Sequence, residues 1–123
     1  MIKKLQLSLK TKWFEMTKQG IKTEDYREIN PYWYSRLCLY RGEHKTQKWW
    51  KEYFEYHFSI DQESRTSFKS FKTNKMTLGY PKQTDTERII EFEHKGIEIG
   101  YGKEEWGAEP NKLYFIIKHG KQL

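Results

Sequence analysis

Gly20-Ile21-Lys22-Thr23-Glu24-Asp25-Tyr26-Arg27-Glu28 is the most informative segment of this 123-residue chain. It combines charged side chains of both signs with a tyrosine. Glycine readily takes the left-handed conformation that ends a helix, so Gly20 is expected to close one. Asp25 and Arg27 lie two residues apart on an extended segment and therefore share one face. Lys22 stands in the turn after Gly20, from where its ammonium can reach the same face.

The neighbouring sequence places this segment at a helix-to-strand junction. Residues 2–9 alternate apolar and polar side chains, which is the period of a half-buried strand. Residues 11–19 have the spacing of a short helix, and Asn30-Pro31 favours a second helix after an extended stretch at 23–29. Residues 42–64 are predicted to be helical or irregular. Three extended stretches are predicted to follow, at 67–80 with a break near Asn74, 88–101 with a turn at Lys95-Gly96, and 112–119.

The composition predicts one compact domain, residues 1–123, whose core depends on aromatic rings. The chain has 5 Trp, 9 Tyr and 7 Phe, and each of these rings buries a large area. The order of elements favours an α+β fold, in which a mixed sheet curls into a small β-barrel with flanking helices. No apolar run has the length of a membrane span or of a secretion signal, so we expect a cytoplasmic protein with no membrane partner.

The charge and the cysteine and histidine content narrow the classes of partner. A net charge of +6 favours polyanions, although such charges are more often a solvated surface. Cys38 is the only cysteine, which excludes an internal disulfide and predicts a partly buried thiol. The four histidines have no metal-ligand spacing, so we expect no metal and no cofactor.

The segment at residues 20–28 resembles the signature of the ASCH domain family, Gly-x-Lys-x-x-Glu-x-Arg. Gly20, Lys22 and Arg27 match this signature, and Asp25 stands where the family usually has Glu. The likeness covers nearly the whole chain except about 42–64. It implies a PUA-like barrel with a pocket between the first helix and the sheet. It also implies that the partner is RNA or a nucleotide-like small molecule.

The candidate binding residues are those of the junction together with one later ring. A carboxylate between two cations stays ionised, a lysine beside it is suited to proton transfer, and the Arg27 fork suits phosphate or a base edge. The alternative is an ion-pair network that only fixes the helix against the barrel. The candidate set is Lys22, Asp25, Tyr26, Arg27 and Trp106, with Lys22 and Asp25 as the candidate catalytic pair.

The resemblance also leaves catalysis open. Some small members of the family hydrolyse the amide of N4-acylated cytidines with a Lys and a Thr of this motif and a later Glu, and others are ribonucleases. Asp25 stands where those amidohydrolases have Thr, so a hydrolase here would use Lys22 as base and a water as nucleophile. The later glutamate would be Glu91, Glu93 or Glu98. A third alternative is an interaction module with a vestigial pocket.

Three tryptophans have two possible roles each. Trp106 follows a predicted strand, where its ring either stacks on a base or plugs the barrel. Trp49 and Trp50 lie between lysines, in a pattern typical of nucleic-acid contact. Adjacent positions on a helix face different ways, so at least one of these two rings is predicted to be core.

Overall fold

The structure is a computed structural model that describes residues 3–57 and 65–123. The chain divides into two compact units, Met1–Tyr26 with Ser70–Leu123 (unit 1) and Arg27–Lys69 (unit 2). The expected single domain 1–123 stays a prediction. The helices are α1 (Thr11–Lys18), α2 (Pro31–Leu37) and α3 (Gln47–His57), with 3₁₀ turns η1 (Thr86–Arg88) and η2 (Glu104–Trp106). The strands are β1 (Lys4–Leu9), β2 (Glu24–Arg27), β3 (Cys38–Tyr40), β4 (Glu43–His44), β5 (Thr66–Phe68), β6 (Thr73–Leu78), β7 (Ile89–Tyr101) and β8 (Leu113–Gln122).

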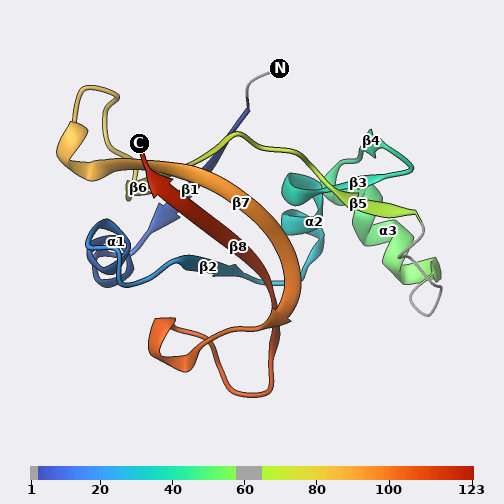
Figure 1. Cartoon of the computed structure of the whole chain (residues 1–123). Helices are drawn as coiled ribbons and strands as arrows, with labels where there is room; N and C mark the ends of the chain where they lie inside the picture. The colour runs from blue at the N-terminus through green and yellow to red at the C-terminus, as the bar shows by residue number, and fades with distance from the viewer. Residues whose placement is uncertain (1–2, 58–64) are drawn as a thin grey trace. The chain divides into compact units, whose positions relative to one another are not determined.

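A mixed five-stranded sheet organises unit 1, with strand order β1-β6-β7-β8-β2. The β1 and β6 strands pair in parallel, whereas β6 with β7 and β7 with β8 pair antiparallel. The long β7 strand bends along its length, and β8 follows it (Figure 1). The α+β class and the curled mixed sheet are therefore confirmed, and the finer assignment to a PUA-like barrel stays a prediction.

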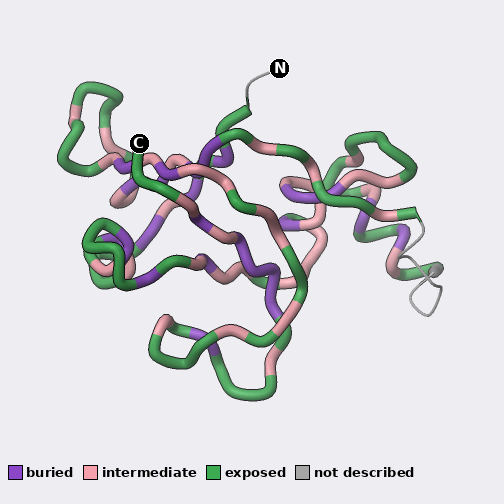
Figure 2. The backbone as a smooth tube through the Cα atoms, in the orientation of Figure 1, coloured by how far each residue is buried: buried purple, intermediate pink, exposed green. Residues whose placement is uncertain are grey.

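The alternation in the first strand builds much of the unit 1 core. Leu5, Leu7 and Leu9 are buried, as the period-two pattern predicted. Phe14 of α1 and Phe115 of β8 are also buried, and Figure 2 shows the buried stretches along these elements. The helix predicted at 11–19 and the strand predicted at 2–9 are thus found at nearly the expected bounds, residue 2 lying outside the described residues.

One predicted interruption is found a few residues away from its expected place, and another is wrong. The break in the stretch 67–80 lies at 69–72, between β5 and β6, and Asn74 itself lies inside β6 with its side chain fully buried. The β7 strand runs without a turn at Lys95-Gly96, although its pairing with β8 shifts register between Phe92 and His94 and between His94 and Ile97. Gly96 has φ +113°, so glycine absorbs an irregularity inside the strand that its sequence suggested as a turn.

Unit 2 joins α2 and α3 to a small sheet with order β4-β3-β5. Pro31 opens α2 as expected, and the Asn30 side chain caps it by accepting a hydrogen bond from the Trp33 amide at 2.9 Å. Rings hold the two helices together, with the Tyr34 and Trp50 centroids 4.9 Å apart. The α3 helix covers residues 47–57 of the stretch predicted as helical or irregular, and residues 58–64 lie outside the described residues.

Two further expectations concern the cysteine and membrane-spanning helices. Cys38 is buried, and this burial raises the pKa of its thiol to about 12, against the opposing charge of Lys69. The expected packed thiol is therefore confirmed. Among the described residues, no helix has the length and apolar character needed to cross a bilayer.

The Gly20 position generates a first testable prediction. Gly20 has φ +80°, and a Cβ added there would have no atom within 4 Å, so substitution acts through the backbone alone. We expect Gly20→Ala to lower the free energy of unfolding by about 1 kcal/mol, measured by urea denaturation. Gly20→Asn should cost less, because Asn tolerates the left-handed region. Equal stability of the Ala variant and the native chain would contradict this account.

Candidate functional site

The end of α1 sets the position of Lys22. The Gly20 amide donates to the Thr17 carbonyl at 3.0 Å, and the Ile21 amide donates to the Met16 carbonyl at 2.9 Å. This pair of bonds is the Schellman arrangement, which satisfies the last carbonyls of a helix and turns the chain. The Lys22 amide also donates to the Met16 carbonyl, at 3.1 Å. The junction thus fixes the Lys22 backbone against the helix end before β2 begins.

The Lys22 side chain is buried and surrounded by partners. Its ammonium lies 3.5 Å from the Asp25 carboxylate and donates to the Glu24 carbonyl. The same nitrogen lies 5.9 Å from the Trp13 ring centroid and 5.5 Å from that of Tyr26. Only 2% of the Lys22 side chain and 7% of that of Asp25 are exposed, so the expected ion pair is formed inside unit 1 and not on its surface.

Tyr26 connects the junction to the segment between β7 and β8. Its hydroxyl donates to the Glu24 carboxylate at 2.9 Å and accepts from the Lys103 amide at 3.0 Å. Burial and the Glu24 carboxylate raise the pKa of Tyr26 above its usual range, against the opposing hydrogen bond from Lys103. The expected site residue Tyr26 therefore serves as a neutral hydrogen-bonding link beside Lys22.

Two glycines of that segment make room for the rings that flank Lys22. A Cβ at Gly102 would come within 2.8 Å of the Tyr26 ring, and a Cβ at Gly107 within 2.8 Å of the Trp13 ring. Gly107 also has φ +101°. The chain between β7 and β8 can therefore pack this closely against Tyr26 and Trp13 only because these positions lack side chains.

His119 and Asn74 extend the polar interior of unit 1, and the sequence analysis did not identify them. The His119 amide donates to the Thr23 carbonyl at 3.0 Å, which places this residue of β8 beside the junction. Its Nδ1 lies 2.7 Å from Asn74 Nδ2, and the other end of that amide, Oδ1, lies 2.7 Å from His94 Nδ1. The sequence signal for Asn74 and His119 was that each is a polar residue at an inward position of an otherwise apolar strand. The spacing of the histidines indicates only that they do not form a metal site.

Electrostatics place His119 in the same neighbourhood as the ion pair. Burial lowers the pKa of His119 to about 4, with Lys22 and His94 adding to this shift and Asp25 opposing it. Burial also lowers the pKa of His94. At neutral pH unit 1 therefore encloses an ion pair and a neutral imidazole, which together offer hydrogen-bond donors and acceptors.

Arg27 belongs to the other compact unit and has different neighbours. Its guanidinium lies 4.9 Å from the Trp33 ring centroid, and Arg36 lies at the same distance from that ring. Cation–π contacts of this kind stabilise partly buried arginines. The predicted joint face of Lys22, Asp25 and Arg27 stays a prediction.

The later candidates lie at several other positions in unit 1. Trp106 is half-buried in η2, with the Lys103 ammonium 4.3 Å from its ring centroid. This partial burial does not decide between the two predicted roles, stacking on a base and plugging the barrel. Glu91 accepts from the Thr73 hydroxyl at 2.6 Å, and Glu93 accepts from the Lys121 amide at 2.9 Å. Glu98 pairs with Lys118 at 2.9 Å and is 54% exposed. These contacts of the three glutamates are with residues of β6 and β8.

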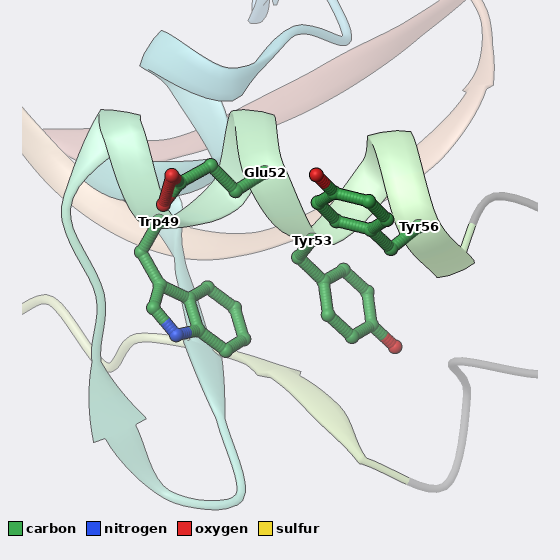
Figure 3. Close-up of a pocket in the computed structure, with 4 residues that line it drawn as sticks. All are labelled: Trp49, Glu52, Tyr53 and Tyr56. Atoms are coloured by element: carbon green, nitrogen blue, oxygen red, sulfur yellow. The ribbon is translucent and has the colours of Figure 1, made fainter.

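Unit 2 holds a hollow of about 200 Å³ on α3, lined by Trp49, Glu52, Tyr53 and Tyr56. These side chains leave one side of the helix, with the Trp49 and Tyr53 rings next to each other and Glu52 and Tyr56 beside them (Figure 3). The Trp49 and Tyr53 rings are nearly parallel, with an angle of 11° between their planes. Trp50 is fully buried, which confirms that one ring of the pair is core.

Positive charge surrounds the rings near this hollow. Burial alone would raise the pKa of Tyr40, but hydrogen bonds and charges from Arg41 and Arg65 lower it. Burial raises the pKa of Tyr53, and the charge of Arg65 opposes this rise. The Lys45 ammonium lies 5.0 Å from the Trp49 ring centroid. Basic side chains other than the lysines that flank Trp49 and Trp50 in the sequence thus lie beside these rings.

Comparison of the chain with protein-family models, curated proteins and solved structures finds no match. Over residues 3–57 and 65–123, no group of three His, Cys, Asp or Glu side chains is placed to hold a metal ion. The chemistry of the site therefore has to be inferred from its own side chains.

The buried ion pair generates a second prediction. Removing one partner leaves the other charge buried without compensation, so Lys22→Met and Asp25→Asn should each lower the free energy of unfolding by about 3–5 kcal/mol. The double variant should lose less than the sum of the two single losses, because the stranded charge is gone. Urea denaturation measures all three.

Lys118→Met is the matched control, since Lys118 belongs to the exposed pair with Glu98. It should change stability far less, because exposed pairs contribute little. Losses of similar size for Lys22→Met and Lys118→Met would show that the junction pair is not energetically buried.

Proposed function

We propose that the chain binds a nucleobase-like group, either in a small nucleotide-like molecule or in RNA, at the polar interior of unit 1. The observation that carries this proposal is the burial of the Lys22 ammonium between the Asp25 carboxylate and the rings of Trp13 and Tyr26. A buried ion pair contributes little net stability compared with apolar side chains of the same size. Its place beside a neutral, buried His119 therefore favours a role in recognition.

The chemistry of these groups matches the edge of a base. A base edge alternates hydrogen-bond donors and acceptors in one plane, and the site offers an ammonium, a carboxylate and an imidazole. Rings beside such polar groups favour a flat ligand over a compact ion. Lys22 already donates to Glu24 and faces Asp25, which supports binding more directly than proton abstraction by this amine.

We also propose that the chain is an ASCH-type domain with a PUA-like barrel. Support comes from the motif residues Gly20, Lys22, Asp25 and Arg27, which lie at the helix-to-strand junction where the family has its signature. The curled mixed sheet of unit 1 is compatible with such a barrel. Under this proposal Asp25 in place of Glu keeps the carboxylate that pairs with Lys22.

The RNA form of the proposal draws support from unit 2. Its described residues include eight Lys and Arg against four Glu, and the α3 hollow presents rings of Trp49, Tyr53 and Tyr56. Proteins that bind single strands combine basic side chains with aromatic rings on which bases stack. The Glu52 carboxylate in the same hollow can accept a hydrogen bond from an exocyclic amine of a base.

The third prediction tests the unit 1 site with the four ribonucleosides and N4-acetylcytidine. At least one of them should raise the melting temperature of the native protein, and calorimetric titration should then give a dissociation constant. Lys22→Met and Asp25→Asn should each weaken that binding at least tenfold. The control is Lys18→Met, which removes an exposed lysine of α1 and should bind as the native chain does.

Chromatography of the same mixtures detects turnover. Consumption of a nucleoside by the native chain but not by Lys22→Met would favour the hydrolase alternative instead of a pure binder. Native affinity in both the Lys22 and the Asp25 variants would contradict the proposed site.

The fourth prediction concerns single-stranded RNA. Log affinity should fall with log salt concentration by about 0.7 for each phosphate neutralised. Tyr56→Ala should weaken binding of a short oligonucleotide by about 1–3 kcal/mol, the contribution of one stacked base. Tyr80→Ala is the matched control, because Tyr80 is 94% exposed and Tyr56 is 76% exposed, yet Tyr80 does not line the hollow. Equal effects of the two variants, or no salt dependence, would exclude this surface as an RNA contact.

A further inference from the structure

The buried amide of Asn74 has one chemically possible orientation. Its Nδ2 lies 3.1 Å from the Lys118 carbonyl and 2.7 Å from His119 Nδ1. A backbone carbonyl only accepts hydrogen bonds, so the atom facing it has to be the NH₂ group. The Oδ1 atom is then the one that lies 2.7 Å from His94 Nδ1. The donor end and the acceptor end of this amide are thereby assigned.

This orientation gives the two histidines opposite tautomers. Nδ2 donates to His119, so His119 Nδ1 carries no proton and the proton of the neutral ring is on Nε2. Oδ1 accepts from His94, so His94 Nδ1 carries a proton. One asparagine thus determines which nitrogen of His119 is a donor, and it does so across 45 positions of sequence.

The Nε2–H group of His119 is left without a partner. The residue is 9% exposed, and its Nε2 is buried with no hydrogen-bond partner within the part of the chain that the structure describes. Leaving a buried donor unpaired destabilises the folded chain, and native proteins rarely do so. The charged and titratable groups that act on this ring are Asp25, Lys22 and His94.

We propose that His119 Nε2–H is a ligand-binding donor of the unit 1 site, that it takes the carbonyl oxygen of a neutral ligand, and that Asn74 is the positioning residue that sets its tautomer. The inference rests on the proposed function of the same site and names the group that the ligand presents. The Asp25 carboxylate and the Lys22 ammonium act on this ring with opposite signs, so the pair adds no net charge and suits a neutral ligand. The ligand carbonyl would accept from His119 Nε2–H, and a ligand N–H next to that carbonyl would donate to the Asp25 carboxylate. Amides and the uracil base carry a carbonyl beside an N–H.

Long-range proton–nitrogen NMR of the ¹⁵N-labelled full chain tests the tautomers without ligand. We expect the Nε2–H form for His119 and the Nδ1–H form for His94 at pH 7. Asn74→Asp replaces the NH₂ donor by an acceptor, so His119 should gain a proton on Nδ1. A purely structural role for Asn74 would predict a loss of stability with no change of tautomer. Finding the Nδ1–H form of His119 in the native chain overturns the proposal.

Titration with uridine, whose ring carbonyls flank an N–H group, tests the ligand contact. Its binding should shift the His119 Nε2–H resonance, and His119→Phe should weaken the affinity at least tenfold. His119→Gln retains an N–H donor of similar reach and should bind within a few-fold of the native chain. Circular dichroism shows whether each variant folds. If His119→Phe fails to fold, the Gln variant and the native resonance shift still decide the outcome.

The outcomes separate this inference from the proposed function. If Lys22→Met abolishes uridine binding while His119→Phe leaves it unchanged, the unit 1 site stands and the role of His119 is wrong. If uridine binds without moving the His119 resonance, the donor serves an internal water and the inference also fails. If uridine does not bind at all, the ligand assignment to His119 fails. The remaining nucleosides then test the proposed function by itself.

Discussion

The contact between the Lys22 ammonium and the Asp25 carboxylate is the constraint around which unit 1 is arranged. A charge taken out of water needs an opposite charge or several hydrogen bonds close by. The helix end at Gly20 brings Lys22 inward, β2 supplies Asp25 and the Glu24 carbonyl, and the chain between β7 and β8 packs around the flanking rings. The helix end, β2 and the segment between β7 and β8 therefore all contribute to burying this ion pair.

The parts of the fold that follow from short-range patterns could be predicted from the sequence. The leucine alternation of β1, the helix ended by Gly20 and the helix opened by Pro31 all depend on residues within a few positions of one another. The pairing of Lys22 with Asp25 is also local, since three positions separate them. These features need no knowledge of the tertiary structure.

The parts that failed depend on partners far away in sequence. Asn74 has the composition signal of a strand break, but Lys118 and His119 satisfy its amide from another strand and allow it to stay inside β6. Gly96 resembles a turn, yet the pairing of β7 with β8 converts it into a register shift. The spacing of residues along the sequence does not show which distant residues come into contact.

The burial of Cys38 in unit 2 has a practical consequence for measuring the protein. The thiol is the only one in the chain, and its raised pKa keeps it in the unreactive protonated form. An alkylating reagent can therefore modify it only when unit 2 opens locally, so the rate of labelling reports that opening event. Unit 1 contains no thiol and is not labelled in the same experiment. The rate of alkylation therefore measures the opening of unit 2 alone, without an engineered cysteine.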